Sequence, residues 1–153
     1  MKTLVLGMGN TLLADDGVGI YIAREVRRHL PAGEVEVVET QLAGFYLAEL
    51  LNGYERAIVV DAVRTGKYPP GTIRWLTLQE LGTSSRFLSA HHLGLRTAVE
   101  VGRKMGLTMP QVVHVLTVEV VDTETFAEGC TTAAVSAAIS HAVREILACL
   151  QQA

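Results

Sequence analysis

Near its N-terminus the sequence reads TLVLGMGN (Thr3–Asn10), a short apolar run that stops at two closely spaced glycines. Such a run, rich in branched side chains and bounded by glycine, is typical of a strand that is buried on both faces. We therefore predict a strand over Thr3–Gly7. Strands of this kind occur mainly in parallel sheets that helices cover on both sides, so this stretch favours an α/β fold.

The rest of the chain alternates between helical patterns and short apolar runs. We predict helices over Val18–Leu30, Gly44–Leu51, His91–Met105 and Thr131–Leu150, and strands over Glu34–Glu39, Ala57–Val60, Thr72–Thr77 and Val112–Val118. The prediction is one domain over residues 1–153, a three-layer sandwich. Its mostly parallel, twisted sheet of about five strands carries helices on both faces, with Thr72–Thr77 at an edge.

Composition narrows the functional class. The 153 residues suit one domain, and 49% of them are hydrophobic. The formal charge of −3, without a long basic run, gives no footprint for nucleic acid or an anionic membrane. No apolar run reaches the ~18 residues of a membrane span, and Cys130 and Cys149 are too few for a disulfide framework. We expect a cytoplasmic protein, monomeric, with neither nucleic acid nor membrane as a partner.

Acidic residues follow three of the predicted strands. Asp15 and Asp16 follow the first strand, Asp61 ends the third and Glu119 follows the fifth. The carboxyl ends of parallel strands meet at one edge, where ligands and catalytic groups gather. One aspartate before a helix is normally an N-cap, so we assign the cap to Asp15 and an outward role to Asp16. Asp61 is readable as a turn residue, but it follows a buried strand and is therefore partly desolvated.

Two histidines, His91 and His92, open the third predicted helix. A helix N-terminus disfavours a protonated imidazole, and the neutral form binds metals or accepts a proton. For His91 alone, an ordinary surface histidine is an equally good interpretation. The sequence does not rank His91 above His92. Two carboxylates and one imidazole suit a borderline divalent ion. With no second firm histidine, a metal that comes with the substrate is favoured over resident zinc.

Other chemistries fit less well. The segment Gly7-Met8-Gly9 has Leu12 where a dinucleotide fingerprint needs its third glycine, and the two aspartates nearby would repel a pyrophosphate. Neither a Gly-x-Ser-x-Gly elbow nor a His-Glu-x-x-His helix occurs. Cys130 precedes the last helix and could have a lowered pKa, although a half-buried packing residue is the better interpretation. Cys149 is interpreted as packing.

Three separated motifs resemble the nickel–iron hydrogenase maturation endopeptidases. They are LVLGMGNTLLADDGVG (Leu4–Gly19), IVVDA (Ile58–Ala62) and SAHHLGL (Ser89–Leu95). They occur in the order and at the spacing of that family, and the resemblance covers essentially the whole chain.

The resemblance implies an endopeptidase that removes the C-terminal extension of a hydrogenase large-subunit precursor after nickel insertion. It implies that Asp16, Asp61 and His91 are both the catalytic and the metal-contacting residues, and that nickel is carried by the substrate. Asp16 is the expected general base. The alternative is a non-proteolytic chaperone that binds nickel or the large subunit. The sequence differs from the usual pattern of that family at Thr40–Leu42 and at Glu119-Val120, which leaves open the class of hydrogenase that is the substrate.

Overall fold

The computed structural model describes residues 2–33, 35–41, 45–82 and 90–152 of the chain. Its centre is a five-stranded sheet with the order β2-β1-β3-β5-β4. The strands are β1 (Thr3–Met8), β2 (Val35–Thr40), β3 (Arg56–Val63), β4 (Ile73–Thr77) and β5 (Val112–Glu119). All pairings are parallel except that of β4 with β5. The mostly parallel sheet and the edge position of Ile73–Thr77 were both predicted correctly.

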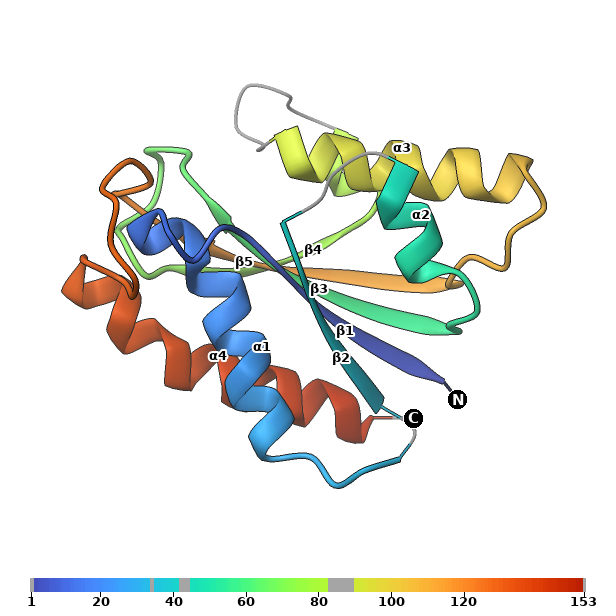
Figure 1. Cartoon of the computed structure of the whole chain (residues 1–153), viewed down its shortest axis with the longest axis horizontal. Helices are drawn as coiled ribbons and strands as arrows, with labels where there is room; N and C mark the ends of the chain where they lie inside the picture. The colour runs from blue at the N-terminus through green and yellow to red at the C-terminus, as the bar shows by residue number, and fades with distance from the viewer. Residues whose placement is uncertain (1, 34, 42–44, 83–89, 153) are drawn as a thin grey trace.

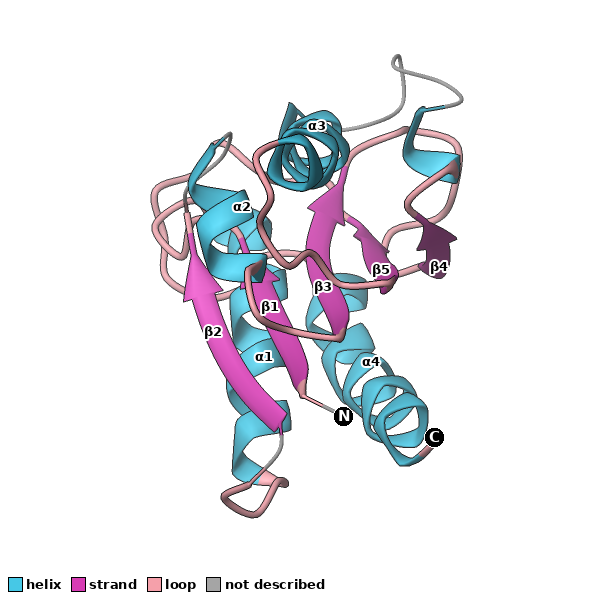
Figure 2. Ribbon diagram, turned by 90° about the vertical axis from the view of Figure 1, so that its right-hand side faces the viewer, coloured by secondary structure: helices cyan, strands magenta, loops and turns pink. Residues whose placement is uncertain are grey.

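Helices cover both faces of this sheet (Figures 1 and 2). On one face lie α1 (Val18–Arg28) and α4 (Ala133–Gln151), and on the other lie α2 (Phe45–Leu51) and α3 (Ala90–Lys104). Two short 3-10 turns, η1 (Ala14–Gly17) and η2 (Glu80–Gly82), were not predicted. The three-layer α/β architecture is confirmed.

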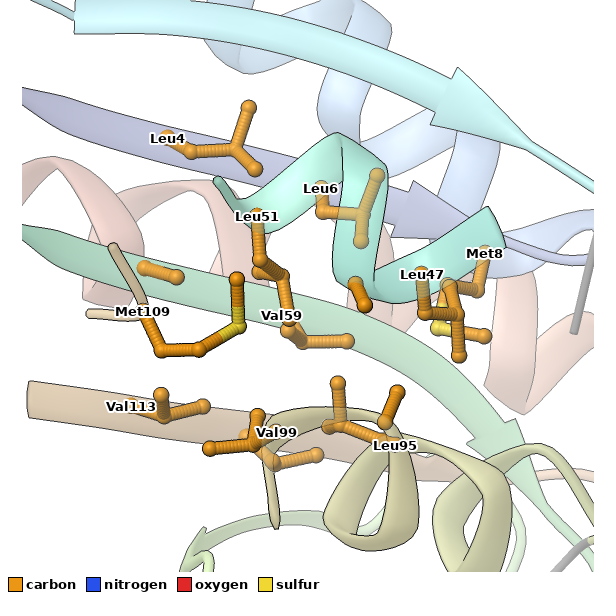
Figure 3. Close-up of a cluster of buried hydrophobic side chains, with 14 of the residues drawn as sticks. Leu4, Leu6, Met8, Leu47, Leu51, Val59, Leu95, Val99, Met109 and Val113 are labelled. Carbon is orange, nitrogen blue, oxygen red and sulfur yellow. The ribbon is translucent and has the colours of Figure 1, made fainter. Parts of the chain in front are cut away.

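The core consists of two hydrophobic clusters on opposite sides of the sheet. In Figure 3, Leu4, Leu6 and Met8 of β1 point toward α2 and α3, where they meet side chains such as Leu47 and Leu95. Val5, between the first two, faces α1 and α4 instead. Successive residues of a strand point to opposite faces, and both faces of β1 are covered by helices, so every position of β1 is buried. Burying one such side chain stabilises the fold by about 1.5–3 kcal/mol.

The last helix, α4, is long and apolar enough to cross a membrane, with a mean hydropathy of 1.4. In the fold it lies along the sheet, and Val135, Ala142 and Ile146 form part of its buried stripe. Its exposed side carries His141 and Arg144. A one-sided apolar stripe with charges opposite is the pattern of a helix that covers a sheet in a globular domain.

Four strands run further than predicted at their carboxyl ends: β1, β2 and β5 by one residue and β3 by three. The expected end of the third strand was Val60, but β3 continues to Val63. It does so because Asp61 pairs with Thr117 and Val63 pairs with Glu119 on β5. Asp61 therefore lies within a strand rather than after it, and Glu119 is the last residue of β5.

Candidate active site

The carboxyl ends of β1, β3 and β5 lie at one edge of the sheet, which we call the carboxyl edge. Three connections gather there: η1 with the residues before it, residues 64–72 after β3, and residues 120–132 before α4 (Figure 1). The acidic residues that the sequence placed beyond the strands all belong to this edge. Their predicted convergence is confirmed for Asp15, Asp16, Asp61 and Glu119.

Glycines set how closely these segments approach each other. A Cβ atom on Gly19 would lie 2.5 Å from the carbonyl oxygens of Met8 and of Val60, so the first turn of α1 rests directly on the ends of β1 and β3. Gly9 has a φ of +148°, and a Cβ there would collide with the carbonyl oxygen of Asp16. The glycines thereby bring Asp16 over the strand ends.

Asp16 lies in η1 and is half-buried. Its Oδ2 accepts a hydrogen bond from the backbone N–H of Asn10 at 3.0 Å. This bond closes the segment between β1 and η1 into a loop, and the N–H of Asp16 donates to the carbonyl of Leu13 at 3.0 Å within the same loop. The carboxylate is therefore held on a defined backbone and still reaches solvent.

Asp61 is buried in the sheet, with 1% of its surface exposed. Its Oδ1 accepts a hydrogen bond from the N–H of Ala62 at 2.8 Å. It stands opposite Thr117 of β5, whose hydroxyl donates to the carbonyl of Arg74 at 3.2 Å. A carboxylate in this position is placed by the strand register and not by a flexible turn, which makes its position more rigid than the sequence suggested.

The third predicted site residue, His91, falls in the first turn of α3. The side chains of His91 and His92 lie outside the described residues. The helix position itself agrees with the predicted one, since α3 begins at Ala90. Among the described side chains, no three His, Cys, Asp or Glu residues are grouped closely enough to hold a metal ion.

Asp15 is fully buried and has a different role from the one predicted. Its Oδ1 accepts the N–H groups of Thr131 at 3.0 Å and Thr132 at 3.1 Å, and its Oδ2 accepts those of Asp122 at 3.1 Å and Val121 at 3.4 Å. Neither η1 nor α1 has a side-chain cap. The prediction that Asp15 caps its own helix is therefore wrong: the carboxylate ties residues 120–132, including the N-cap of α4, to η1.

Glu119 fastens the neighbouring connection. It is buried, and it accepts the N–H of Thr65 at 2.9 Å, the hydroxyl of Thr65 at 2.6 Å and the N–H of Gly66 at 3.1 Å. The sequence left its role open. Because its two oxygens bind the connection after β3, we assign it to the framework of the carboxyl edge.

Cys130 lies at the same edge and is half-buried. Burial, reinforced by the negative charge of Asp15, raises the pKa of its thiol to about 11. The suggestion of a lowered pKa is therefore wrong, since a thiol of this kind is protonated and a poor nucleophile near neutral pH. Of the acidic residues and the cysteine that the sequence pointed to at this edge, Asp16 and Asp61 remain as candidates for chemistry.

Comparison with known proteins gives a consistent result. A family described as hydrogenase maturation protease matches residues 20–149. The hydrogenase 2 maturation protease of Escherichia coli (strain K12) is 32% identical over 108 residues, which are 69% of this chain and 66% of that protein. The hydrogenase expression/formation protein HupD of Rhodobacter capsulatus is 29% identical over 153 residues, covering 96% of this chain and 72% of that protein.

Solved structures show the same fold. The hydrogenase maturating endopeptidase HybD from E. coli superposes with a TM-score of 0.82 and 28% identity, over 99% of this chain and 93% of that one. The [NiFe] hydrogenase maturation protease HybD from Thermococcus kodakarensis gives a TM-score of 0.74 and 25% identity, over 99% and 100%. Against several curated relatives the match spans only about half to two thirds of their length, and the family match begins after Asp16.

Proposed function

Because the chain belongs to the hydrogenase maturation protease family, we propose that it is an endopeptidase acting on a nickel–iron hydrogenase large-subunit precursor. It removes the C-terminal extension of that precursor after nickel has been inserted. The observation that carries this proposal is the placement of Asp16 and Asp61 from separate segments at one edge of the sheet, within a framework that Asp15 and Glu119 build. Several buried acidic residues gathered at one edge of a sheet are typical of a functional site.

The chain's own residues divide the work in this proposal. Asp61, fixed in the sheet, His91, in the first turn of α3, and Asp16, in η1, would contact and position a nickel ion that the precursor carries. That ion supplies positive charge near the scissile carbonyl. Asp16 is the more exposed carboxylate and accepts a proton from the attacking water. The water oxygen bonds to the carbonyl carbon, the C–N bond breaks, and the departing amine takes up the proton that Asp16 accepted from the water, which restores the Asp16 carboxylate.

The partner in this proposal is the precursor, met in the cytoplasm by a monomer of this chain. We expect the precursor to dock against the predicted helices over Gly44–Leu51 and His91–Met105, because they flank the site. They correspond to α2 and α3, which lie together on one face of the sheet.

A non-proteolytic chaperone is the competing function, and turnover separates the two. The purified chain is incubated with a large molar excess of nickel-loaded precursor, and mass spectrometry follows the C-terminal extension. We expect removal at one bond from more precursor molecules than there are enzyme molecules. Nickel-free precursor is the control and should stay intact. If loaded precursor binds stoichiometrically and is never cut, the chain is a chaperone and the proposal fails.

A further inference from the structure

Of the large hydrophobic side chains exposed on the connections at the carboxyl edge, the two with the largest exposed fractions are Phe126 and Leu12. Phe126 is 86% exposed and Leu12 is 55% exposed. The segments that carry them are joined, because the N–H of Ala127 donates to the carbonyl of Leu12 at 3.1 Å and Leu13 forms a parallel bridge with Ala127. Leu12 and Phe126 therefore occupy neighbouring positions on two paired segments. We call them the apolar pair.

The backbone under Phe126 is held firmly. The carboxylate of Asp122 accepts the N–H groups of Glu124 at 3.2 Å and Thr125 at 3.0 Å and the hydroxyl of Thr131 at 2.8 Å. These bonds hold the pKa of the Asp122 carboxyl below its usual range. Asp15 adds the four backbone bonds described above. A side chain presented on a fixed backbone loses little conformational freedom on binding, which favours affinity.

The same loop is anchored a second time at its far end. The N–H of Gly129 donates to the hydroxyl of Tyr21 at 2.7 Å, and that hydroxyl also donates to the carbonyl of Thr11 at 3.3 Å. Tyr21 thus links residues 120–132 to the segment that leads to Asp16. The apolar pair and Asp16 therefore share one hydrogen-bonded framework.

The charge around the pair identifies the kind of partner. Residues 120–132 contain Asp122, Glu124 and Glu128 but no Lys, Arg or His. Arg64, on the connection after β3, pairs with Glu124 at 3.7 Å, so these three carboxylates and one cation together carry a net charge of −2. Such a loop is repelled by an anionic membrane surface. It complements a polypeptide that offers an apolar side chain next to basic ones, since aromatic anchors surrounded by complementary charge are typical of protein interfaces.

We propose that the apolar pair binds the stretch of precursor next to the scissile bond, through an apolar side chain flanked by basic residues. This inference rests on the proposed function, because it names the substrate segment that the same site receives. Phe126 is the anchor and Leu12 extends its surface toward Asp16. The pair acts in binding and takes no part in bond cleavage.

The test compares Phe126→Ala, Phe126→Leu and Val112→Ala with wild type. Val112 is the control, because it is also an exposed apolar side chain (40%) and it begins β5, at the opposite end of the strand from the carboxyl edge. Cleavage of nickel-loaded precursor gives KM and kcat, and a binding titration of the precursor gives Kd. We expect Phe126→Ala to raise KM and Kd about tenfold, which corresponds to about 1.4 kcal/mol, with kcat within about twofold. Phe126→Leu should recover most of the affinity, and Val112→Ala should bind and cleave the precursor as wild type does.

Several results would overturn the inference. KM and Kd of Phe126→Ala equal to those of wild type would do so, as would a fall in kcat alone. A shift from dimer to monomer in sedimentation of Phe126→Ala would show that the pair contacts a second copy of the chain. If wild type binds the precursor but never cuts it, the proposed function fails, and the Kd comparison still decides whether Phe126 binds the precursor.

Discussion

Charged residues are buried at one edge of the sheet and exposed at the other; we call the edge at the amino ends of the parallel strands the amino edge. At the carboxyl edge, Asp15, Asp61 and Glu119 are buried and tied by backbone donors. At the amino edge, Lys2 and Glu36 form an ion pair at 3.8 Å with about half of each side chain exposed. An exposed pair contributes at most about 1 kcal/mol, whereas a buried carboxylate is costly unless its acceptors are satisfied. Among the described residues, the buried carboxylates of Asp15, Asp61 and Glu119 all lie at the carboxyl edge, which is also the edge of the candidate site.

The largest effect on the difference between the two edges is expected from removing the carboxylate of Asp15. Asp15→Ala leaves the N–H groups of four residues without their acceptor, and two of these, residues 131 and 132, immediately precede α4. We expect a loss of about 3 kcal/mol or more in the free energy of unfolding, measured by urea denaturation. Glu124→Ala is the control, because Glu124 is on the same loop but 87% exposed, and it should change stability by less than about 0.5 kcal/mol. Equal effects of the two changes would contradict the framework role of Asp15.

A smaller loss of stability is expected when a methyl group is placed between α1 and the ends of β1 and β3. Gly19→Ala should destabilise the fold by about 2 kcal/mol, because the new methyl group meets two carbonyl oxygens at 2.5 Å. By helix propensity alone the same change would stabilise α1 by about 1 kcal/mol, so the sign of the effect is informative. Gly33→Ala is the matched control, since nothing lies within 4 Å of its added Cβ. Thermal unfolding of both variants provides the measurement, and a stabilised Gly19→Ala would refute the close approach.

The smallest loss of stability is expected from a substitution at the amino edge, and its effect should change mainly at high pH. The hydroxyl of Tyr54 donates to Glu36, and burial together with that carboxylate raises the pKa of Tyr54 from 10.0 to about 12. Because the pKa is raised in the folded state, the resulting stability is complete below pH 10 and is lost as the pH rises toward 12. Tyr54→Phe should cost about 1 kcal/mol at pH 7.

The same variant should lose less stability than wild type between pH 10 and 12, measured by urea denaturation at each pH. Parallel stability curves for the two proteins over that range would contradict the raised pKa of Tyr54.

The layered fold was predictable because its signals are local. The central strands are short apolar runs in the sequence. The buried stripes of α1 and α4 appear there as apolar residues that recur about every 3.6 positions. The end of β3 was not predictable in this way. Asp61 interrupts the apolar run, and what keeps it in the strand is pairing with β5, more than fifty residues later in the chain.

The roles of the two adjacent aspartates could not be separated for a related reason. A cap is a local interaction, whereas the donors to Asp15 lie 106 to 117 residues away. The choice of Asp16 as the outward residue came from weighing caps and from the resemblance, and the structure supplies a physical reason for its neighbour to be fixed. For Cys130, position before a helix suggested a lowered pKa, but its burial beside Asp15 has the opposite effect. Burial is a property of the fold and not of the local sequence.

The central claim is that Asp15 builds the edge while Asp16 and Asp61 act there. The most direct measurement pairs denaturation with cleavage of nickel-loaded precursor for Asp16→Asn and Asp15→Asn. We predict that Asp16→Asn keeps the free energy of unfolding within about 1 kcal/mol of wild type and cuts at least about 100-fold more slowly. Asp15→Asn should lose stability, and its folded fraction should account for any loss of cleavage. Cleavage by Asp16→Asn at the wild-type rate would contradict the claim.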